Sequence, residues 1–348
     1  MLLSIVSFII VFTLLATVHE AGHYIWAKRA GIRVFEFGFG FGPRLFSLER
    51  NGTIFSLNLI PILAFVRIAG EGEAEDDLAC PDNELFYNKT PAQKAKTLLA
   101  GPLGNILCAF IILVFLFALA GIPSGVSREI ASVVPGSPAE HSGIKVGDVL
   151  LSINGRSYSQ MEEAVDFIHS VKNQPLTLTL QRGKDKIEVK ATPKYNAQLK
   201  LSLLGFTPKP VYQSVNFFLA VYHAAVQTFS MIVLTLIIIG RLLSGAVRLT
   251  DLAGPVGIAQ VTGRYAQSGL ISLVAFAAFL NVNVGVLNLL PLPALDGGHL
   301  TFVLIEWLRR KPLDRQLVNK INSWGMLALL TLMALVTLND ILRVFGRS

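Results

Sequence analysis

The sequence predicts a polytopic α-helical membrane protein with four transmembrane helices, a membrane-associated β-hairpin element and one small α+β domain. Of its 348 residues, 52% are hydrophobic and only 15% are charged, a balance that ordinary soluble proteins do not have. Four apolar stretches approach the roughly 20 helical residues that a bilayer crossing requires. Region 122–208 instead carries short strands, one helix and glycine-bearing turns, which is typical of a small soluble domain.

The spanning helices are expected at residues 2–27, 97–121, 270–296 and 325–345. A fifth apolar stretch, 212–243, carries several polar residues in its first half. It is interpreted as a tilted or interfacial amphipathic helix on the outer side of the membrane. The net charge is +7, but the basic residues lie at the ends of apolar segments and form no patch with aromatic residues. They indicate topology, and no nucleic-acid partner is expected.

Ionisable side chains inside the first and third spans predict a metal site. His19 and His23 are four residues apart, so on a helix both imidazoles project from one face and can share a metal ion. Glu20 lies one residue further round and can reach a metal-bound water. Asp296, at the end of the third span, completes a zinc-hydrolase set. Because such side chains are costly in an apolar span, a chance match is the weaker alternative.

The topology follows from charge and parity. Four basic residues soon after the first span place the following loop in the cytoplasm, so the second span delivers 122–211 to the outside. If 212–243 also crossed, the third span would leave Asp296 on the far side of the membrane from His23. If it does not cross, Asp296 lies near the cytoplasmic face at the depth of the histidines. We expect the second arrangement.

An apolar β-element is expected between the first two spans. Phenylalanines alternate with other residues over 35–41, and Asn51-Gly52 is a strong hairpin signal. Exposed backbone at membrane depth is tolerated only against protein or a wet cavity, so this element should line the chamber that holds the metal. Its strand at Phe65 and Arg67 would hold an unwound substrate chain by β-augmentation. A purely structural hairpin that caps the helices is the alternative.

A motif within 122–208 has a known counterpart. The run SPAEHSGIKVGDVLLSING at 137–155 resembles that of a PDZ domain. In the permuted bacterial form that it resembles, the last strand supplies the carboxylate-binding loop, here Leu204, Gly205 and Phe206. The region is therefore expected to be an extracytoplasmic PDZ-like α+β domain.

Together the motifs resemble the site-2 protease family of intramembrane zinc metalloproteases, in particular the bacterial regulator-of-sigma proteases with a PDZ insertion. The resemblance covers nearly the entire chain. Its motifs are HEAGH at 19–23, FGFGP at 39–43, AGPLGN at 100–105, GPVGIA at 254–259 and NLLPLPALDGGH at 288–299.

The resemblance implies one zinc ion per chain, ligated by His19, His23 and Asp296. It further implies that Glu20 is the catalytic base and that Asn288 holds the substrate backbone or the oxyanion.

Three further expectations concern the surroundings of this site. Asn105, the last residue of the second-span motif, is assigned to substrate binding. His299 is expected to be structural, because the set of three ligands is already complete. Where close relatives commonly have Pro-Leu-Gly-Gly-Tyr-Val, residues 61–66 read PILAFV, and the loss of both glycines should stiffen that strand. The chain also has a single PDZ unit where some relatives have two.

The domains are expected to be the following: 1–121 with the first two spans and the β-element, 122–208 as the PDZ-like domain, 209–269 with the interfacial helix and the GPVGIA loop, and 270–348 with the last two spans.

The function that the resemblance implies is that of an intramembrane zinc endopeptidase in the bacterial inner membrane, with its active site toward the cytoplasm. Its partners would be the lipid bilayer, single-pass transmembrane substrates such as anti-sigma factors or signal-peptide remnants, and an upstream site-1-type protease. The alternative from another class is a PDZ-bearing membrane scaffold or chaperone with a structural metal site. A structural zinc would need a fourth protein ligand, which favours the enzyme. A transporter function is even less well supported, because no inverted repeat is visible among the expected spans.

Overall fold

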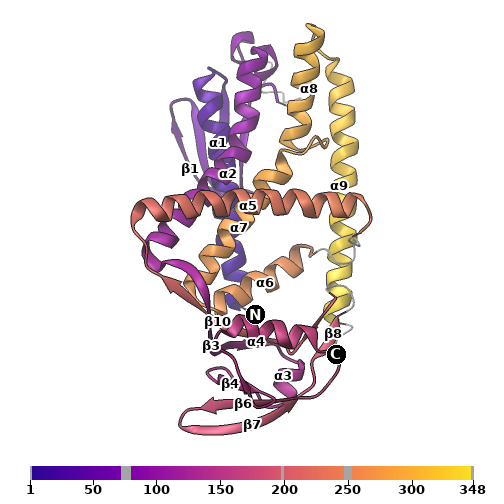
Figure 1. The fold of residues 1–348 in the computed structure, drawn as a ribbon. Coiled ribbons are helices and arrows are strands. Elements are labelled where there is room, and N and C mark those ends of the chain that lie inside the picture. The colour runs from indigo at the N-terminus through magenta and orange to yellow at the C-terminus, as the bar shows by residue number, and fades with distance from the viewer. Residues whose placement is uncertain (1, 72–79, 197–199, 247–252, 346–348) are drawn as a thin grey trace. The chain divides into compact units, whose positions relative to one another are not determined.

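The computed structural model describes residues 2–71, 80–196, 200–246 and 253–345. The chain divides into two units. The helical unit comprises Met1–Phe117 and Phe217–Ser348, and the β-rich unit comprises Ala118–Asn216. Figure 1 shows the elements of both units in chain order.

The helical unit contains long helices, short 3-10 turns and one β-hairpin. The helices are α1 (Leu2–Arg29), α2 (Pro91–Ala120), α5 (Phe217–Leu243), α6 (Pro255–Gln267), α7 (Leu270–Asn288), α8 (Asp296–Arg309) and α9 (Arg315–Phe345), and the 3-10 turns are η2 (Asp82–Glu84) and η3 (Phe86–Asn88). Among the described residues, five helices are long and apolar enough to cross a membrane, namely α1, α2, α5, α7 and α9. The apolar stretches of the sequence therefore do form long helices.

The third expected span is shorter than the sequence suggested. The prediction of one helix over 270–296 is wrong, because α7 ends at Asn288 and Asp296 opens a separate helix, α8. Pro291 and Pro293 interrupt the apolar run between them. A proline has no backbone N–H and drives the preceding residue out of the helical conformation, so the backbone breaks here. Asp296 is therefore the first residue of α8 and not part of the spanning helix α7.

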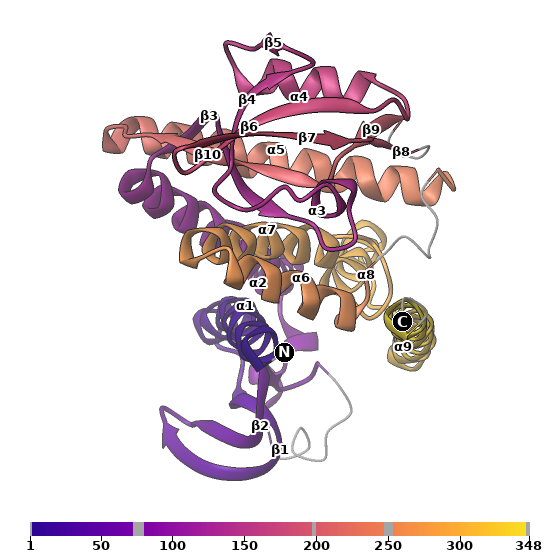
Figure 2. The ribbon, with the colours of Figure 1, turned by 90° about the horizontal axis from the view of Figure 1, so that it is seen from below.

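Helix α5 differs in direction from α1 and α9. In Figure 1 α1 and α9 run up the view and α5 runs across it, and in Figure 2, where α1 and α9 are seen end-on, α5 is seen along its length. It packs on α7, and the Thr235 hydroxyl donates a hydrogen bond of 3.2 Å to Asn283 Oδ1 of that helix. Such polar contacts between apolar helices are common in membrane proteins.

The predicted hairpin is confirmed. Strands β1 (Val34–Arg50) and β2 (Thr53–Ile68) are antiparallel. Asn51 and Gly52 join them with φ values of 52° and 69°, and positive φ at both positions gives the turn that matches the twist of a hairpin.

Both strands bend, so the hairpin makes a sheet of four rows. Residues 44–50 pair with 53–58 next to the turn, and residues 34–39 pair with 54–57 on one side and with 64–68 on the other. The bend of β2 lies near Leu63, whose φ is 66°, a left-handed conformation that a leucine rarely adopts. The row 64–68 is therefore at an edge of the sheet, and β2 lies against α1.

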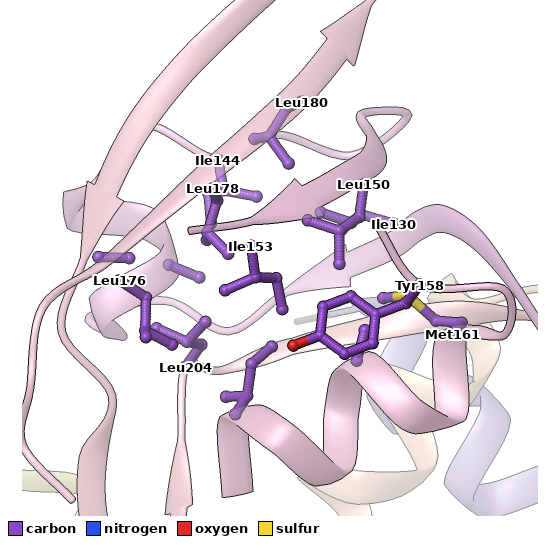
Figure 3. Packing of buried hydrophobic residues seen from close by; sticks show 14 residues of the cluster. Ile130, Ile144, Leu150, Ile153, Tyr158, Met161, Leu176, Leu178, Leu180 and Leu204 are labelled. Carbon is purple, nitrogen blue, oxygen red and sulfur yellow. The ribbon is translucent and has the colours of Figure 1, made fainter. Parts of the chain in front are cut away.

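The β-rich unit is an α+β domain. Its strands and helices are β3 (Ile122–Val133), α3 (Pro138–His141), β4 (Val149–Ile153), β5 (Arg156–Ser157), α4 (Met161–Ser170), β6 (Leu176–Arg182), β7 (Asp185–Ala191), β8 (Lys194–Asn196), β9 (Leu201–Leu203) and β10 (Phe206–Gln213). The main sheet has the order β10-β3-β4-β6-β7. Its apolar face packs on α3 and α4 around Ile153, Leu178 and Met161, as Figure 3 shows.

Candidate metal centre

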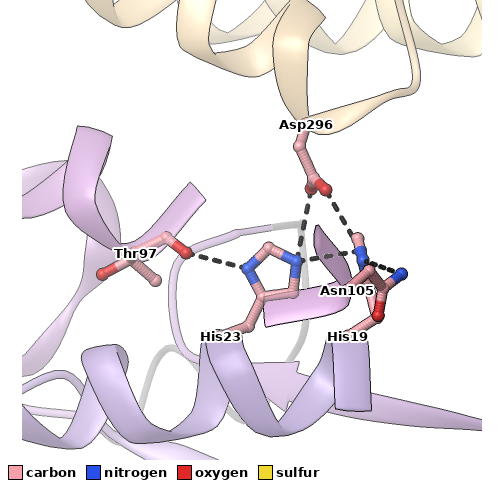
Figure 4. A network of polar contacts seen from close by, with 5 residues as sticks. All are labelled: His19, His23, Thr97, Asn105 and Asp296. Carbon is pink, nitrogen blue, oxygen red and sulfur yellow. Dashed lines mark hydrogen bonds and ion pairs between the residues drawn. The ribbon is translucent and has the colours of Figure 1, made fainter. Parts of the chain in front are cut away.

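Three side chains from two distant parts of the chain converge on one point. His19 and His23 come from α1, and Asp296 comes from the first turn of α8 (Figure 4). His19 Nε2 lies 3.1 Å from Asp296 Oδ2, and His23 Nε2 lies 3.5 Å from Asp296 Oδ1. The two Nε2 atoms are 3.2 Å apart. The pairing of the histidines with Asp296 that was expected from the sequence is therefore present.

The geometry of this group fits a zinc ion. One possible ligand atom from each of the three residues lies within 4.8 Å of the other two. Two ligands of tetrahedral zinc, each about 2.0–2.1 Å from the metal, are about 3.3 Å apart. The separation of the two Nε2 atoms, 3.2 Å, and those from each Nε2 to one of the two Asp296 oxygens, 3.1 and 3.5 Å, bracket that value. Two imidazoles and a carboxylate would leave a fourth position open, as catalytic zinc requires.

Helix α2 orients both histidines. The Thr97 backbone carbonyl oxygen lies 2.8 Å from His23 Nδ1, so this nitrogen carries the proton and Nε2 is free for a metal. The Asn105 amide lies 3.4 Å from His19 Nδ1. For His19 to ligate through Nε2, its Nδ1 must donate, so the Asn105 amide must present Oδ1, which an amide flip supplies. The buried Asn105 Oδ1 has no other hydrogen-bond partner among the described residues.

Two glycines make room for this arrangement. A Cβ at Gly22 would overlap the Ala100 carbonyl oxygen, so this glycine lets α1 and α2 approach closely. A Cβ at Gly101 would overlap the His23 ring at Nε2. The glycines of the HEAGH and AGPLGN motifs are therefore explained by packing around the histidines.

Glu20 lies between the three ligands and the sheet edge. Its carboxylate accepts a hydrogen bond from the Val66 backbone N–H and is close enough to Asp296 and His23 to interact with their charges. Neighbouring residues of a strand point their backbone groups to opposite sides. The main chain of Phe65 and Arg67 accordingly faces β1, and that of Val66 faces the metal centre. Nothing in the sequence singles out Val66, because only its backbone takes part.

Two other expected site residues, Asn288 and His299, are not among the described polar contacts of the three ligands. Asn288 is the half-buried last residue of α7 and is not part of the network in Figure 4. His299 lies one turn beyond Asp296 on α8, with Nε2 3.4 Å from Asn322 Nδ2 of α9, and it is outside the group of possible metal ligands.

The expected carboxylate-binding loop belongs to the β-rich unit. Leu204 is buried in its core, and its carbonyl oxygen accepts a hydrogen bond from the Ala139 N–H. Gly205 has a φ of 86° and packs against Ser137. Phe206 begins β10, the strand at one edge of the sheet.

Comparison with known proteins identifies the class. The sequence pattern of Peptidase family M50 matches residues 7–332, which is most of the chain. The chain therefore belongs to this family, and it is a metallopeptidase with several apolar helices of membrane-spanning length.

Two curated relatives align over almost their whole length. Zinc metalloprotease RasP of Geobacillus kaustophilus (strain HTA426) is 32% identical, with 98% of each chain covered. Regulator of sigma-W protease RasP of Bacillus subtilis (strain 168) is 30% identical, with 98% of this chain and 99% of that protein covered. Among solved structures, the PDZ domain of an SdrC-like protein from Listeria monocytogenes matches 25% of this chain and 90% of its own, at 22% identity and a TM-score of 0.22.

Proposed function

We propose that this chain is an intramembrane zinc endopeptidase that cuts single-pass transmembrane proteins within or beside the bilayer. The observation that carries the proposal is the convergence of His19, His23 and Asp296 at separations that suit zinc, with Glu20 beside them. Zinc at this site would polarise the scissile carbonyl and lower the pKa of a bound water toward about 7.

The residues around the metal site would transfer the proton, orient the two histidines and bind the substrate. Glu20 takes the proton of the attacking water and passes it to the leaving amine. The Thr97 carbonyl keeps the proton of His23 on Nδ1, and Asn105 does the same for His19. Asn288 would bind the extended substrate backbone or the developing oxyanion, for which one donor is typically worth about 3 kcal/mol.

Substrate would bind as a strand beside β2. A helical peptide cannot reach the metal until its scissile bond is unwound, and an edge strand can hold the extended chain through main-chain hydrogen bonds. The row 64–68 supports this role, because it is at the sheet edge and the main chain of Val66 faces Glu20. The main chain of Phe65 and Arg67 faces β1, so these two residues would contact substrate through their side chains and not, as expected from the sequence, through main-chain hydrogen bonds. The hairpin would therefore act in substrate binding and not only as a cap.

The proposed topology has four spans, with α5 in the interface. Its direction across α1 and α9 supports this assignment, although α5 is apolar enough to span. If α5 is not a transmembrane span, Asp296 and the two histidines lie toward the cytoplasmic side of the membrane. Region 122–208 is then extracytoplasmic and, as a PDZ-like domain with the loop Leu204 to Phe206, would admit substrates that an upstream protease has already shortened.

The Bacillus subtilis relative is named for the regulation of sigma-W. By this likeness, membrane-anchored anti-sigma factors are the first substrates to test, and signal-peptide remnants are the second. The rival function, a scaffold with a structural metal, is less well supported, because the group found among the described residues offers three ligands and not four.

The test is co-expression with a panel of single-pass proteins, each in full-length and externally truncated form. The intact chain should shorten some truncated substrates, Glu20→Gln should shorten none, and Asn288→Ala should be slower but still hold zinc. Substrates with Gly or Pro near the scissile bond should be cut faster, since these residues cost a helix about 1 and 3 kcal/mol relative to Ala. No product from any substrate, or equal products with Glu20→Gln, would contradict the proposal.

A further inference from the structure

Helix α2 presents one face to the elements that carry the proposed zinc ligands. Lys94, Thr97, Gly101 and Asn105 follow one another at intervals of three or four residues and therefore share a face of the helix. The last three contact the rings of the two histidines. Lys94 contacts neither ring and belongs to a different interaction.

Lys94 binds the helix of the third ligand. Its Nζ lies 3.0 Å from Glu306 Oε2, and the two side chains are only 9% and 19% exposed. Glu306 lies on α8, the helix that Asp296 opens. Its other carboxylate oxygen accepts a hydrogen bond of 3.1 Å from the Leu313 N–H, just before α9. One carboxylate thus joins α2, α8 and the start of α9.

Apolar packing alone leaves the position of α8 underdetermined. Val303 of α8 packs against Leu98 and Ala27, but apolar contact has no preferred direction. On the side of Lys94 and Glu306, α8 borders a cavity of about 210 Å³ that also reaches His299, so the residues that the structure describes do not pack closely against α8 over that cavity. A metal site tolerates errors of about 0.2 Å in ligand distance, whereas a slip of one residue moves a helix by about 1.5 Å.

We propose that Lys94 and Glu306 are positioning residues for the metal ligand Asp296. Their ion pair fixes the rotation and axial position of α8 against α2, the same helix that orients His19 and His23. Helix α2 then sets the positions of all three metal ligands. This inference rests on the proposed zinc site and adds the means by which its third ligand is held in place.

The test is zinc affinity of the purified full-length chain, measured by competition with a chelator of known affinity. Lys94→Met and Glu306→Gln should each weaken zinc binding by 10- to 100-fold, the range typical of groups that orient metal ligands. Lys94→Arg keeps the charge and should stay within about threefold of wild type. Because the two residues act as a pair, the combined loss in Lys94→Met/Glu306→Gln should be smaller than the product of the single losses.

A cobalt-loaded form gives a readout that a loss of folding does not imitate. The visible absorption of Co²⁺ reports its coordination, and it should change in Lys94→Met while the circular dichroism of the chain stays unchanged. Asp148→Asn is the matched control, because it breaks another pair with a buried carboxylate, Arg182–Asp148 of the β-rich unit, and should leave zinc affinity unaltered.

Three results would overturn the inference: unchanged zinc affinity in both single variants, losses that multiply in the double variant, or an equal loss in Asp148→Asn. If the single variants do not fold, the neutral double variant buries no unpaired charge, and unchanged zinc affinity there would also overturn it. Failure of the proposed function looks different, since the wild-type chain itself would then bind no zinc.

Discussion

Replacing Gly101 with alanine should remove the metal site while leaving the helices intact. Gly101 is in the interior of α2, where alanine is the better helix former by about 1 kcal/mol. Local propensity therefore predicts a more stable protein. The space around Gly101 predicts that the metal site is lost, because the added Cβ would overlap His23 at Nε2, the atom that would bind zinc.

The size of the effect follows from the required movement. To reach ordinary contact at 3.4–4 Å, the ring must shift by more than about 1 Å, several times the 0.2 Å tolerance of a metal–ligand bond. The ring cannot simply rotate away, because its Nδ1 is held 2.8 Å from the Thr97 carbonyl oxygen. A misplacement of about 1 Å costs on the order of 100-fold in rate, so we expect at least that loss of activity together with loss of bound zinc.

The assay measures zinc per chain, cleavage of a single-pass substrate and the thermal unfolding of the purified protein. Gly104→Ala is the matched control on the same helix, since its Cβ would meet the Val18 carbonyl oxygen at 3.4 Å, an ordinary contact. It should keep zinc and activity. Full zinc occupancy and activity in Gly101→Ala, or an equal loss in Gly104→Ala, would refute the reasoning.

Three further outcomes are expected. Leu63→Gly should raise the free energy of unfolding by up to about 1.5 kcal/mol, because a left-handed non-glycine residue costs about 1–2 kcal/mol and glycine costs about 0.5–1 kcal/mol in chain entropy. Denaturant unfolding checks this, and a clear loss of stability contradicts it. Hydrogen bonding to Arg182 holds the pKa of Asp148 below its usual range, so the stability that this pair adds is complete above pH about 4 and is lost as the pH falls through the lower folded value. The difference in melting temperature between wild type and Asp148→Asn should therefore shrink on acidification, and a constant difference would exclude this cause. In a chain without its native cysteines, a cysteine at Ser268 should react with an impermeant thiol reagent from outside and one at Lys311 should not; labelling of Ser268 only from inside would mean that α5 spans.

The sequence predicted those parts of the site that depend on local periodicity. The spacing of His19 and His23 on a helix is enough to place both rings on one face, and the Asn51-Gly52 turn is enough to place a hairpin. The association of these histidines with Asp296 could be expected only from charge parity and family likeness, because helix periodicity says nothing about partners so distant in the chain.

Other features carry no readable signal. Pro291 and Pro293 indicate a break after Asn288, but the apolar run around them is long enough to predict an unbroken span. The fold-back of β2 depends on a left-handed conformation at Leu63, a residue type that does not predict one. In the sequence, Lys94 does not differ from other basic residues near the start of a span. Its ion pair with Glu306 depends on the position of α8, which the sequence does not show.

Cleavage of a transmembrane substrate by the purified chain in lipid vesicles, with and without zinc, tests the proposed function most directly. Wild type should contain about one zinc per chain, lose activity when a chelator removes it and regain activity when zinc is returned. Glu20→Gln should hold the same zinc and cut nothing. Cleavage by the metal-free chain, or by Glu20→Gln at the wild-type rate, would contradict the assignment of this site as a zinc peptidase centre.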